Sequence, residues 1–168
     1  MFNFGILTVS DKGSQGQRLD KSGEAIRDNL SRVDSRLVKY EIVPDEVKVI
    51  ADKLAGWADG GGVDVILTTG GTGLGPRDVT PEATLSVVDK VVPGFAEAMR
   101  GQTLSLTPMA MLSRATAGIR GKCLILNLPG SPKAVQECLE VVLPAIPHAV
   151  EIIKGEVTEH LAPKTGTD

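Results

Sequence analysis

Residues 68–81 have the composition expected of an anion-binding loop, with the sequence TTGGTGLGPRDVTP. Four of the six residues from position 70 to position 75 are glycine. Glycine lets the backbone turn sharply and lets a ligand approach without a Cβ atom in the way, so this loop can direct several amide groups at phosphate oxygens. Thr68, Thr69 and Thr72 add hydroxyl donors. Glycines that only shape a tight connection are the alternative, but we favour a binding loop for a phosphorylated small molecule.

The two common nucleotide fingerprints do not describe this segment. No Gly-Lys-Ser or Gly-Lys-Thr follows the glycines, and the spacing Gly-x-Gly-x-x-Gly is absent. The sequence therefore supports neither a P-loop nor a Rossmann dinucleotide site.

Two aspartates could supply negative charge beside the loop. Asp78 follows Arg77 within it, and Asp45, next to Glu46, follows a predicted strand. A carboxylate beside a phosphate is unfavourable unless a cation lies between them, and Mg²⁺ commonly takes one or two carboxylates together with substrate phosphates. Each aspartate could instead cap the helix that follows it. The residues alone leave both interpretations open.

Three further segments could contribute contacts. In residues 129–133 (PGSPK), Ser131, Lys133 and the free amides of a helix start could hold a phosphate, although a simple strand-to-helix turn explains the sequence equally well. Ser113 and Arg114 could add a hydroxyl and a guanidinium fork, although an arginine in a loop is more often a surface charge. Residues 10–14 (SDKGS) follow the first predicted strand.

Short apolar runs alternate with helical patterns along the chain, which predicts an α/β fold of βαβ units. We predict strands at residues 4–9, 37–43, 63–67 and 122–128, and a turn or strand end at 118–121. We predict helices from the apolar spacing near residues 26–33, 47–58, 95–104 and 132–142. Pro81 should be the first residue of a short helix, and Pro144 and Pro147 should bend or restart the last one.

The order of these elements predicts where a ligand binds. The run at 63–67 is apolar on both sides of Asp64, as in a parallel strand covered on both faces. In open α/β sheets, ligands bind where loops leave the carboxyl ends of the strands. The loops after the first, third and last predicted strands should therefore form the site.

The composition limits the class of protein. The 168 residues carry a net charge of 18 − 21 = −3 and only 3% aromatic side chains, so neither a basic field nor stacking platforms for a nucleic acid are expected. No signal peptide or bilayer-spanning run is evident, which favours a cytoplasmic protein that does not bind membranes. Residues 1–154 should form one domain, followed by a loose tail at 155–168. Cys123 and Cys138 should be buried free thiols, and His148 and His160 structural or solvent-facing.

Taken together, these motifs resemble the molybdopterin-binding family, and specifically its MogA-type molybdopterin adenylyltransferases. The matching segments are residues 68–73, 76–82, 92–95, 112–114 and 127–133, with 9–11 and 44–46. The resemblance extends from about residue 4 to residue 154. Several ordered blocks are far more specific than one glycine-rich loop.

The resemblance implies a three-layer α/β/α fold with a mostly parallel central sheet, commonly assembled as a homotrimer. It also implies a step of molybdenum cofactor biosynthesis, in which the terminal phosphate of molybdopterin attacks the α-phosphate of ATP in the presence of Mg²⁺. The products would be adenylyl-molybdopterin and pyrophosphate. Other proteins of molybdenum cofactor biosynthesis are candidate partners.

The same resemblance implies roles for individual residues. Asp45 and Asp78 correspond to the catalytic, metal-binding carboxylates, and Ser113 to the residue that holds the molybdopterin phosphate. The predicted substrate-binding residues are Ser10, Asp11, Thr69, Gly70, Gly71, Thr72, Gly73, Ser113, Arg114, Pro129, Gly130 and Ser131. A phosphate monoester is already an anionic nucleophile, so such a reaction needs positioning and charge neutralisation. No catalytic histidine is required.

Two other functions remain open at this stage. Related domains bind molybdopterin without adenylating it, or insert molybdate as parts of larger proteins. The presence of both Asp45 and Asp78 favours the adenylating branch. A non-catalytic molybdopterin-binding protein and a nucleotide hydrolase on the same fold are the alternatives.

Overall fold

Six strands form one mixed sheet in the computed structural model, which describes residues 1–156. They are β1 (Phe2–Val9), β2 (Ser35–Val43), β3 (Val65–Thr69), β4 (Lys90–Val91), β5 (Ala117–Arg120) and β6 (Cys123–Leu128). The strand order is β2-β1-β3-β6-β5-β4. The first four strands in this order are parallel, and the last two pair antiparallel. The prediction of a mostly parallel sheet is confirmed.

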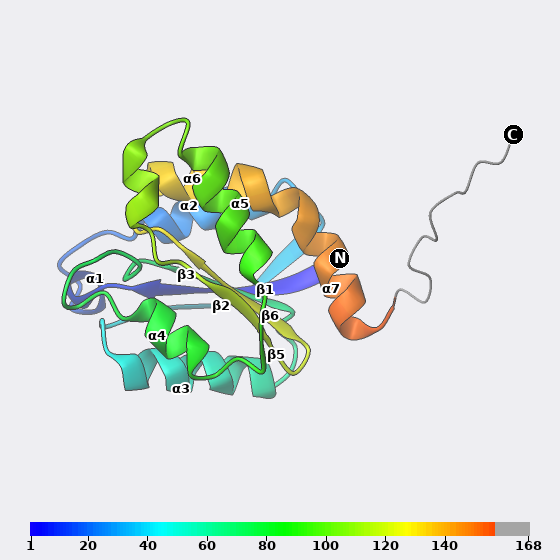
Figure 1. Ribbon diagram of the computed structural model, residues 1–168. Helices are drawn as coiled ribbons and strands as arrows, with labels where there is room; N and C mark the ends of the chain where they lie inside the picture. Colours follow the sequence, from blue (N-terminus) through cyan, green and yellow to red (C-terminus); the bar gives the residue numbers. More distant parts are fainter. Residues whose placement is uncertain (157–168) are drawn as a thin grey trace, which may run out of the picture.

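Helices cover both faces of this sheet and make three layers (Figure 1). They are α1 (Asp11–Ser14), α2 (Lys21–Leu30), α3 (Val47–Asp59), α4 (Thr80–Leu85), α5 (Pro93–Thr103), α6 (Pro132–Val142) and α7 (Ile146–Lys154). Two 3-10 helices lie in the connections: η1 (Pro108–Leu112) between α5 and β5, and η2 (Leu143–Ala145) between α6 and α7. Helices α2, α5, α6 and α7 lie on one face, and α3 and α4 on the other.

Each face has its own apolar core, because successive strand residues point to opposite sides. On the first face, Ile6, Val65 and Leu67 pack with Ile26 of α2 and Leu139 of α6. On the second face the packing partners are Leu7, Ile66, Ile125, Leu54 and Trp57. All five residues of β3 are buried, which confirms the prediction of a strand covered on both sides.

Several predicted boundaries need correction. Strand β3 runs two residues further towards the glycine loop than predicted, because Thr68 and Thr69 pair with both β1 and β6. Residues 117–120 form β5, and Gly121, with a φ of +55°, turns the chain into β6. Helix α4 begins at Thr80, so Pro81 is its second residue. The restart of the last helix near Pro144 and Pro147 is confirmed.

The remaining predictions concern cysteines, histidines and the tail. Cys123 and Cys138 are free and buried, and burial raises the pKa of Cys123 to about 12 and of Cys138 to about 11. His148 is exposed on α7. The predicted loose tail, apart from its first two residues, and His160 lie outside the described residues. Within residues 1–156, no helix is long and apolar enough to cross a bilayer.

Candidate active site

The predicted site residues gather at one edge of the sheet, where β1, β2, β3 and β6 end. Asp11 begins α1, separated from the end of β1 by one residue, and Asp45 follows β2. The glycine loop follows β3, and Pro129 to Ser131 follow β6. Parallel pairing brings these ends together, as expected for ligand sites of open α/β sheets.

Two glycines shape the start of the glycine loop. Gly70 has a φ of +95°, and a Cβ there would lie 2.3 Å from the Val9 carbonyl oxygen. Gly71 has a φ of +67°, and its Cβ would lie 2.3 Å from Thr80 Oγ1. Thr80 also donates to the Gly70 carbonyl at 2.9 Å. The backbone therefore requires glycine at both positions, and the loop is held against β1 and α4.

The next two glycines make room for a carboxylate. A Cβ on Gly73 would lie 2.8 Å from Asp78 Oδ2, and one on Gly75 would lie 2.9 Å from the same oxygen. Neither residue has a left-handed backbone. The Gly75 amide donates to Asp78 Oδ2 at 2.8 Å, and the Asp78 amide donates to the Gly75 carbonyl at 3.0 Å. These two hydrogen bonds between Gly75 and Asp78 close the turn that carries the Asp78 carboxylate.

Asp11 and Asp45 are linked to each other and to the glycine loop. The Asp11 amide donates to Asp45 Oδ2 at 2.8 Å, and the Asp45 amide donates to Asp11 Oδ1 at 3.0 Å. Burial raises the pKa of Asp45, and the negative charges of Asp11 and Asp78 add to that rise. A Cβ on Gly71 would lie 3.2 Å from Asp45 Oδ1, so Asp45 faces the loop.

Arg77 contributes a positive charge to this cluster. Its Nε and Nη2 atoms donate to the two carboxylate oxygens of Asp11, at 3.0 and 2.9 Å. This bidentate pair lowers the pKa of Asp11. Arg77 therefore joins the glycine loop to α1 next to Asp45. The sequence alone does not indicate this pair, because Arg77 and Asp11 are 66 positions apart.

The helix-capping alternatives for the two aspartates are wrong. The N-cap residue of α3 is Glu46, and that of α4 is Val79. Neither cap has a side-chain hydrogen bond. The carboxylates of Asp45 and Asp78 instead accept amides from Asp11 and Gly75.

These carboxylates fit a Mg²⁺ ion that is also bound by substrate. Within residues 1–156, no cluster of three or more histidine, cysteine, aspartate or glutamate side chains could hold a metal by itself. Mg²⁺ commonly uses one or two carboxylates and takes its other oxygens from water and phosphates. Burial is the main cause of the raised pKa of Asp45, and the negative charges of Asp11 and Asp78 add to it; a cation beside Asp45 would favour its ionised form.

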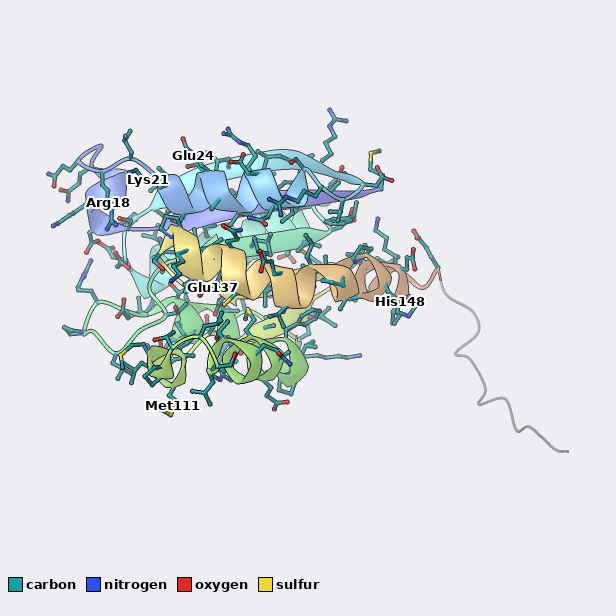
Figure 2. All side chains as sticks on the ribbon, turned by 90° about the horizontal axis from the view of Figure 1, so that it is seen from above. Arg18, Lys21, Glu24, Met111, Glu137 and His148 are labelled. Carbon is teal, nitrogen blue, oxygen red and sulfur yellow. The ribbon has the colours of Figure 1, made fainter. Side chains whose placement is uncertain are left out.

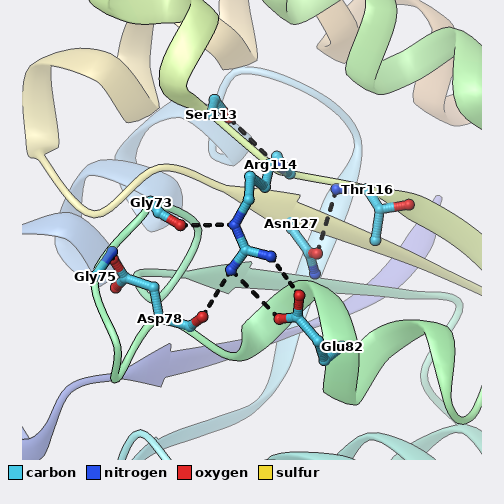
Figure 3. A network of polar contacts seen from close by, with 9 residues as sticks. Gly73, Gly75, Asp78, Glu82, Ser113, Arg114, Thr116 and Asn127 are labelled. Atoms are coloured by element: carbon cyan, nitrogen blue, oxygen red, sulfur yellow. Dashed lines mark hydrogen bonds and ion pairs between the residues drawn. The ribbon is translucent and has the colours of Figure 1, made fainter.

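Arg114 lies where it was predicted but makes different contacts (Figure 3). Its guanidinium donates to the carbonyls of Gly73 and Asp78, each at 2.7 Å, and to the carboxylate of Glu82. The Arg114 guanidinium, which was predicted to bind a phosphate, is thus already hydrogen-bonded to groups of the protein. The preceding Ser113 is half-buried, and its hydroxyl accepts the Ala115 amide at 3.3 Å.

The threonines at the end of β3 also differ from prediction. Thr68 and Thr69 are fully buried, so the prediction that their hydroxyls face a ligand is wrong. Thr69 donates to the Pro129 carbonyl at 2.6 Å and ties the two loops together. Thr68 and Thr84 each accept a hydrogen bond from Asn127 Nδ2, at 3.0 and 2.9 Å. A single asparagine in an apolar strand was the only sequence signal of this buried network.

Serines cap the helices on either side of the site. Ser10 accepts the Gly13 amide at 3.0 Å, and Ser131 accepts the Ala134 amide at 3.2 Å. A Cβ on Gly130 would lie 3.4 Å from the Gly70 Cα, so the two glycine-containing loops approach each other closely. Ser131 is exposed, so its side chain is accessible to a ligand.

Two cavities open beside the loop at residues 129–132. One has a volume of about 380 Å³ and is lined by Ser10, Arg18, Lys21 and Gly130, among others. Arg18 and Lys21 lie at the α1 end of the molecule in Figure 2. The other cavity has a volume of about 320 Å³, and its lining includes Met99, Met109, Ser113, Ser131 and Lys133.

Asp20 is a feature that sequence reasoning missed. Burial alone would raise its pKa, but hydrogen bonds from Thr8, Tyr40, Gly23 and Ser22 outweigh burial and lower it. The carboxylate caps α2 and ties it to β1 and β2. A Cβ on Gly23 would lie 2.3 Å from Asp20 Oδ2. The Asp20-Lys21-Ser22-Gly23 sequence could have been interpreted as a helix cap.

Known proteins share this fold and much of this sequence. A 155-residue alignment with the molybdopterin adenylyltransferase of Helicobacter pylori strain J99 is 48% identical and covers 91% of this chain and 88% of the relative. The crystal structure of the molybdopterin biosynthesis enzyme MoaB from Thermus thermophilus has a TM-score of 0.88 and 56% identity, covering 92% of this chain and 98% of that one. The tungsten cofactor synthesizing protein MoaB from Pyrococcus furiosus has a TM-score of 0.83 and 39% identity, covering 92% and 98%.

The match to a family model extends over most of the chain. Residues 5–148 match the model described as a probable molybdopterin binding domain. This range includes the glycine loop, both carboxylates and the loop at residues 129–133. The chain belongs to the molybdopterin-binding domain family of molybdenum cofactor biosynthesis.

Proposed function

We propose that this protein is a molybdopterin adenylyltransferase that transfers AMP from ATP to the terminal phosphate of molybdopterin and releases pyrophosphate. The observation that carries the proposal is that two carboxylates flank the glycine loop: Asp45, which follows β2 and faces Gly71, and Asp78, which lies within the loop and faces Gly73. The Helicobacter relative with the same activity in its name supports it.

The reaction can proceed without activation of a side-chain nucleophile. The terminal phosphate of molybdopterin attacks the α-phosphorus of ATP, a new P–O bond forms, and the bond to the β-phosphate breaks to release pyrophosphate. The protein has to hold two anions in line and offset their repulsion. The amides of the glycine loop and of the start of α6 are suited to orient phosphate oxygens.

Asp45 and Asp78 would hold Mg²⁺ together with the phosphates of ATP. When bound, Mg²⁺ neutralises the negative charge that builds up around the transferred phosphorus. Asp11 and Arg77 would not bind the metal themselves but would position the residues that do. Asp11 fixes Asp45 through paired backbone contacts, and Arg77 holds the glycine loop to Asp11.

One of the two cavities suggests where molybdopterin binds. Ser113 and Ser131 line the cavity that also contains Met99 and Met109, and methionine suits the sulfur-bearing, largely flat pterin. We place molybdopterin there, with its phosphate towards Ser113 and Ser131. The sheet edge near Asp45 and Gly71 then remains for the α-phosphate of ATP.

The proposal extends to the catalytic unit, the oligomeric state and the partners of the protein. We propose that residues 1–154 form the catalytic unit and that it assembles as a homotrimer in the cytoplasm. Other molybdenum cofactor biosynthesis proteins would deliver molybdopterin and accept the adenylate. Size-exclusion chromatography with light scattering would test the trimer directly.

The activity itself is tested by incubating the purified protein with molybdopterin, Mg²⁺ and ATP and measuring pyrophosphate. The proposal expects pyrophosphate release that requires all three additions. A carrier would bind molybdopterin without releasing pyrophosphate. A nucleotide hydrolase would turn over ATP without the pterin. Either of these results would replace the proposed function.

A further inference from the structure

Arg114 makes an unusually complete set of contacts with the loop that carries Asp78. Nε donates to the Gly73 carbonyl and Nη2 to the Asp78 carbonyl, each at 2.7 Å. Nη1 contacts one oxygen of Glu82, and Nη2 reaches the other at 3.4 Å. The Arg114 amide also donates to the Thr72 carbonyl at 2.9 Å. One residue thus holds three points of the loop and the first turn of α4.

These contacts hold both sides of the turn that carries the carboxylate. The Gly73 carbonyl lies before the Gly75–Asp78 turn, and the Asp78 carbonyl lies at its end. Within the turn, the Gly75 amide is directed at Asp78 Oδ2. In Figure 3 the guanidinium lies between the glycine loop and α4, with its donors directed at both. Moving Arg114 would therefore release the backbone on both sides of the Asp78 side chain.

The same contacts leave little of Arg114 for a ligand. A guanidinium has five N–H donors, and the four hydrogen bonds to Gly73, Asp78 and Glu82 use four of them. The carboxylate of Glu82 also pairs with the positive charge, which raises the pKa of Arg114 and lowers that of Glu82. A phosphate would have to displace Glu82 to gain a bidentate contact.

We propose that Arg114 is a positioning residue: it fixes the backbone around Asp78, with Glu82 holding its guanidinium in place, and it does not bind the substrate phosphate. The inference deepens the proposed adenylyl transfer and rests on it for its effect on catalysis. Its effect on the loop can be measured without any substrate.

Arg120 provides a matched control elsewhere in the fold. Its Nε and Nη2 atoms donate to both oxygens of Asp59 at 2.9 and 2.7 Å, and its Nη1 donates to the Val87 carbonyl at 2.8 Å. Its side chain is 28% exposed, compared with 35% for Arg114. Arg120 thus combines a bidentate pair and a carbonyl contact, but its partners lie on α3 and after α4.

The first test compares amide hydrogen exchange in Arg114→Gln and Arg120→Gln without substrates. We expect the Gly75 and Asp78 amides to exchange at least about tenfold faster in Arg114→Gln than in the wild type, since exchange follows local opening. In Arg120→Gln they should exchange as in the wild type. Equal exchange of these two amides in wild type and Arg114→Gln would overturn the proposal.

The second test uses Glu82→Gln, a change at an exposed side chain. If Arg114 bound the substrate phosphate, removing the competing Glu82 charge would tighten molybdopterin binding. The positioning role expects the opposite pattern, in which the Kd for molybdopterin stays within about twofold and kcat falls several-fold. Tighter binding with kcat unchanged would refute it. Glu82→Gln therefore still tests the proposal if Arg114→Gln folds poorly.

The third variant, Arg114→Lys, retains the charge but not the planar fork. A positioning residue should not be rescued by lysine, so kcat should stay about tenfold or more below the wild type while KM for molybdopterin changes little. Recovery of wild-type kcat by lysine would contradict the proposal. If the wild type itself forms no adenylate, the proposed function fails, and the hydrogen-exchange comparison still decides the role of Arg114.

Discussion

Asp11 and Asp45 hold each other's backbone: each carboxylate accepts the amide hydrogen of the other residue, at 3.0 and 2.8 Å. The pair connects the ends of β1 and β2, 34 positions apart in the chain. The carboxylate of each aspartate thereby fixes the backbone position of the other aspartate. The carboxylate proposed to bind the metal is placed by a second carboxylate, whose own charge is balanced by Arg77.

Removing the Asp11 side chain should loosen this arrangement. In Asp11→Ala, the Asp45 amide loses its acceptor and Arg77 its partner, and we expect the free energy of unfolding to fall. The exposed ion pair itself should contribute little to this loss. Urea denaturation measures the change. As a control, Asp28→Ala removes an exposed side chain whose ion pair with Arg27 spans 3.9 Å, and should alter stability by less than about 0.5 kcal/mol. Equal effects of the two variants would show that the paired contacts contribute nothing.

Two substitutions test whether adenylation needs the negative charge of Asp78. Asp78→Asn keeps an oxygen for the Gly75 amide but loses the negative charge, whereas Asp78→Ala loses both. We expect both variants to bind molybdopterin and to lose most of the adenylation rate, about 100-fold or more, as is common when a catalytic electrostatic group is removed. Pyrophosphate release measures the rate, and pterin fluorescence measures binding. Adenylation by Asp78→Asn at the wild-type rate would rule out the role of the carboxylate as a metal ligand.

Gly70 and Gly16 form a matched pair for testing the glycine loop. Both have a positive φ, +95° and +71°, but a Cβ on Gly70 would meet the Val9 carbonyl at 2.3 Å, whereas one on Gly16 meets nothing within 4 Å. Gly16→Ala should cost about 1–2 kcal/mol of stability through backbone strain alone. Gly70→Ala should cost clearly more and should weaken molybdopterin binding, because the loop must move away from β1. Thermal unfolding and binding assays would reveal the difference, and similar losses in the two variants would argue against the close approach.

The same loop predicts an effect of Gly73→Val on ligand affinity. A side chain at this position would collide with Asp78 Oδ2 and crowd the backbone that faces the ligand. We expect molybdopterin to bind at least about tenfold more weakly, equivalent to about 1.4 kcal/mol. Fluorescence titration measures this affinity. If the Kd matches that of the wild type, the loop does not cradle the ligand.

Asp20 should make stability depend on pH. Its pKa in the folded protein is below the ordinary value of 3.8, so the ionised carboxylate stabilises the fold above that pH, and the contribution is lost as the pH falls through the folded pKa. Asp20→Asn should therefore destabilise the protein more at pH 7 than at pH 3. Urea unfolding at the two pH values gives the comparison. A loss of equal size at both would mean that the hydrogen bonds matter and the charge does not.

Much of the fold could be predicted because its signals are local. The apolar run at β3 and the proline at the start of α6 each depend on a few neighbouring residues. Strand β5 was harder to recognise, because Ala117 and Gly118 carry little β propensity and the strand is fixed by its pairing with β6.

The candidate site could be predicted only in part. Asp45 and Asp78 lie at the expected edge of the sheet because loop position follows from strand order. The partners of Arg114 could not be predicted, since Gly73 is 41 positions away and its carbonyl has no sequence signature. For the same reason Thr69 looked like a ligand donor, although its hydroxyl binds the Pro129 carbonyl, 60 residues later.

The most direct test of the proposed function is mass spectrometry of the pterin product after incubation of the protein with molybdopterin, Mg²⁺ and ATP. The proposed function predicts that the mass of molybdopterin increases by that of one AMP moiety, with one pyrophosphate released for each adenylate formed. It also predicts that Asp78→Asn forms both products at least about 100-fold more slowly than the wild type. Unmodified molybdopterin from the wild-type protein, with or without ATP consumption, would contradict the assignment.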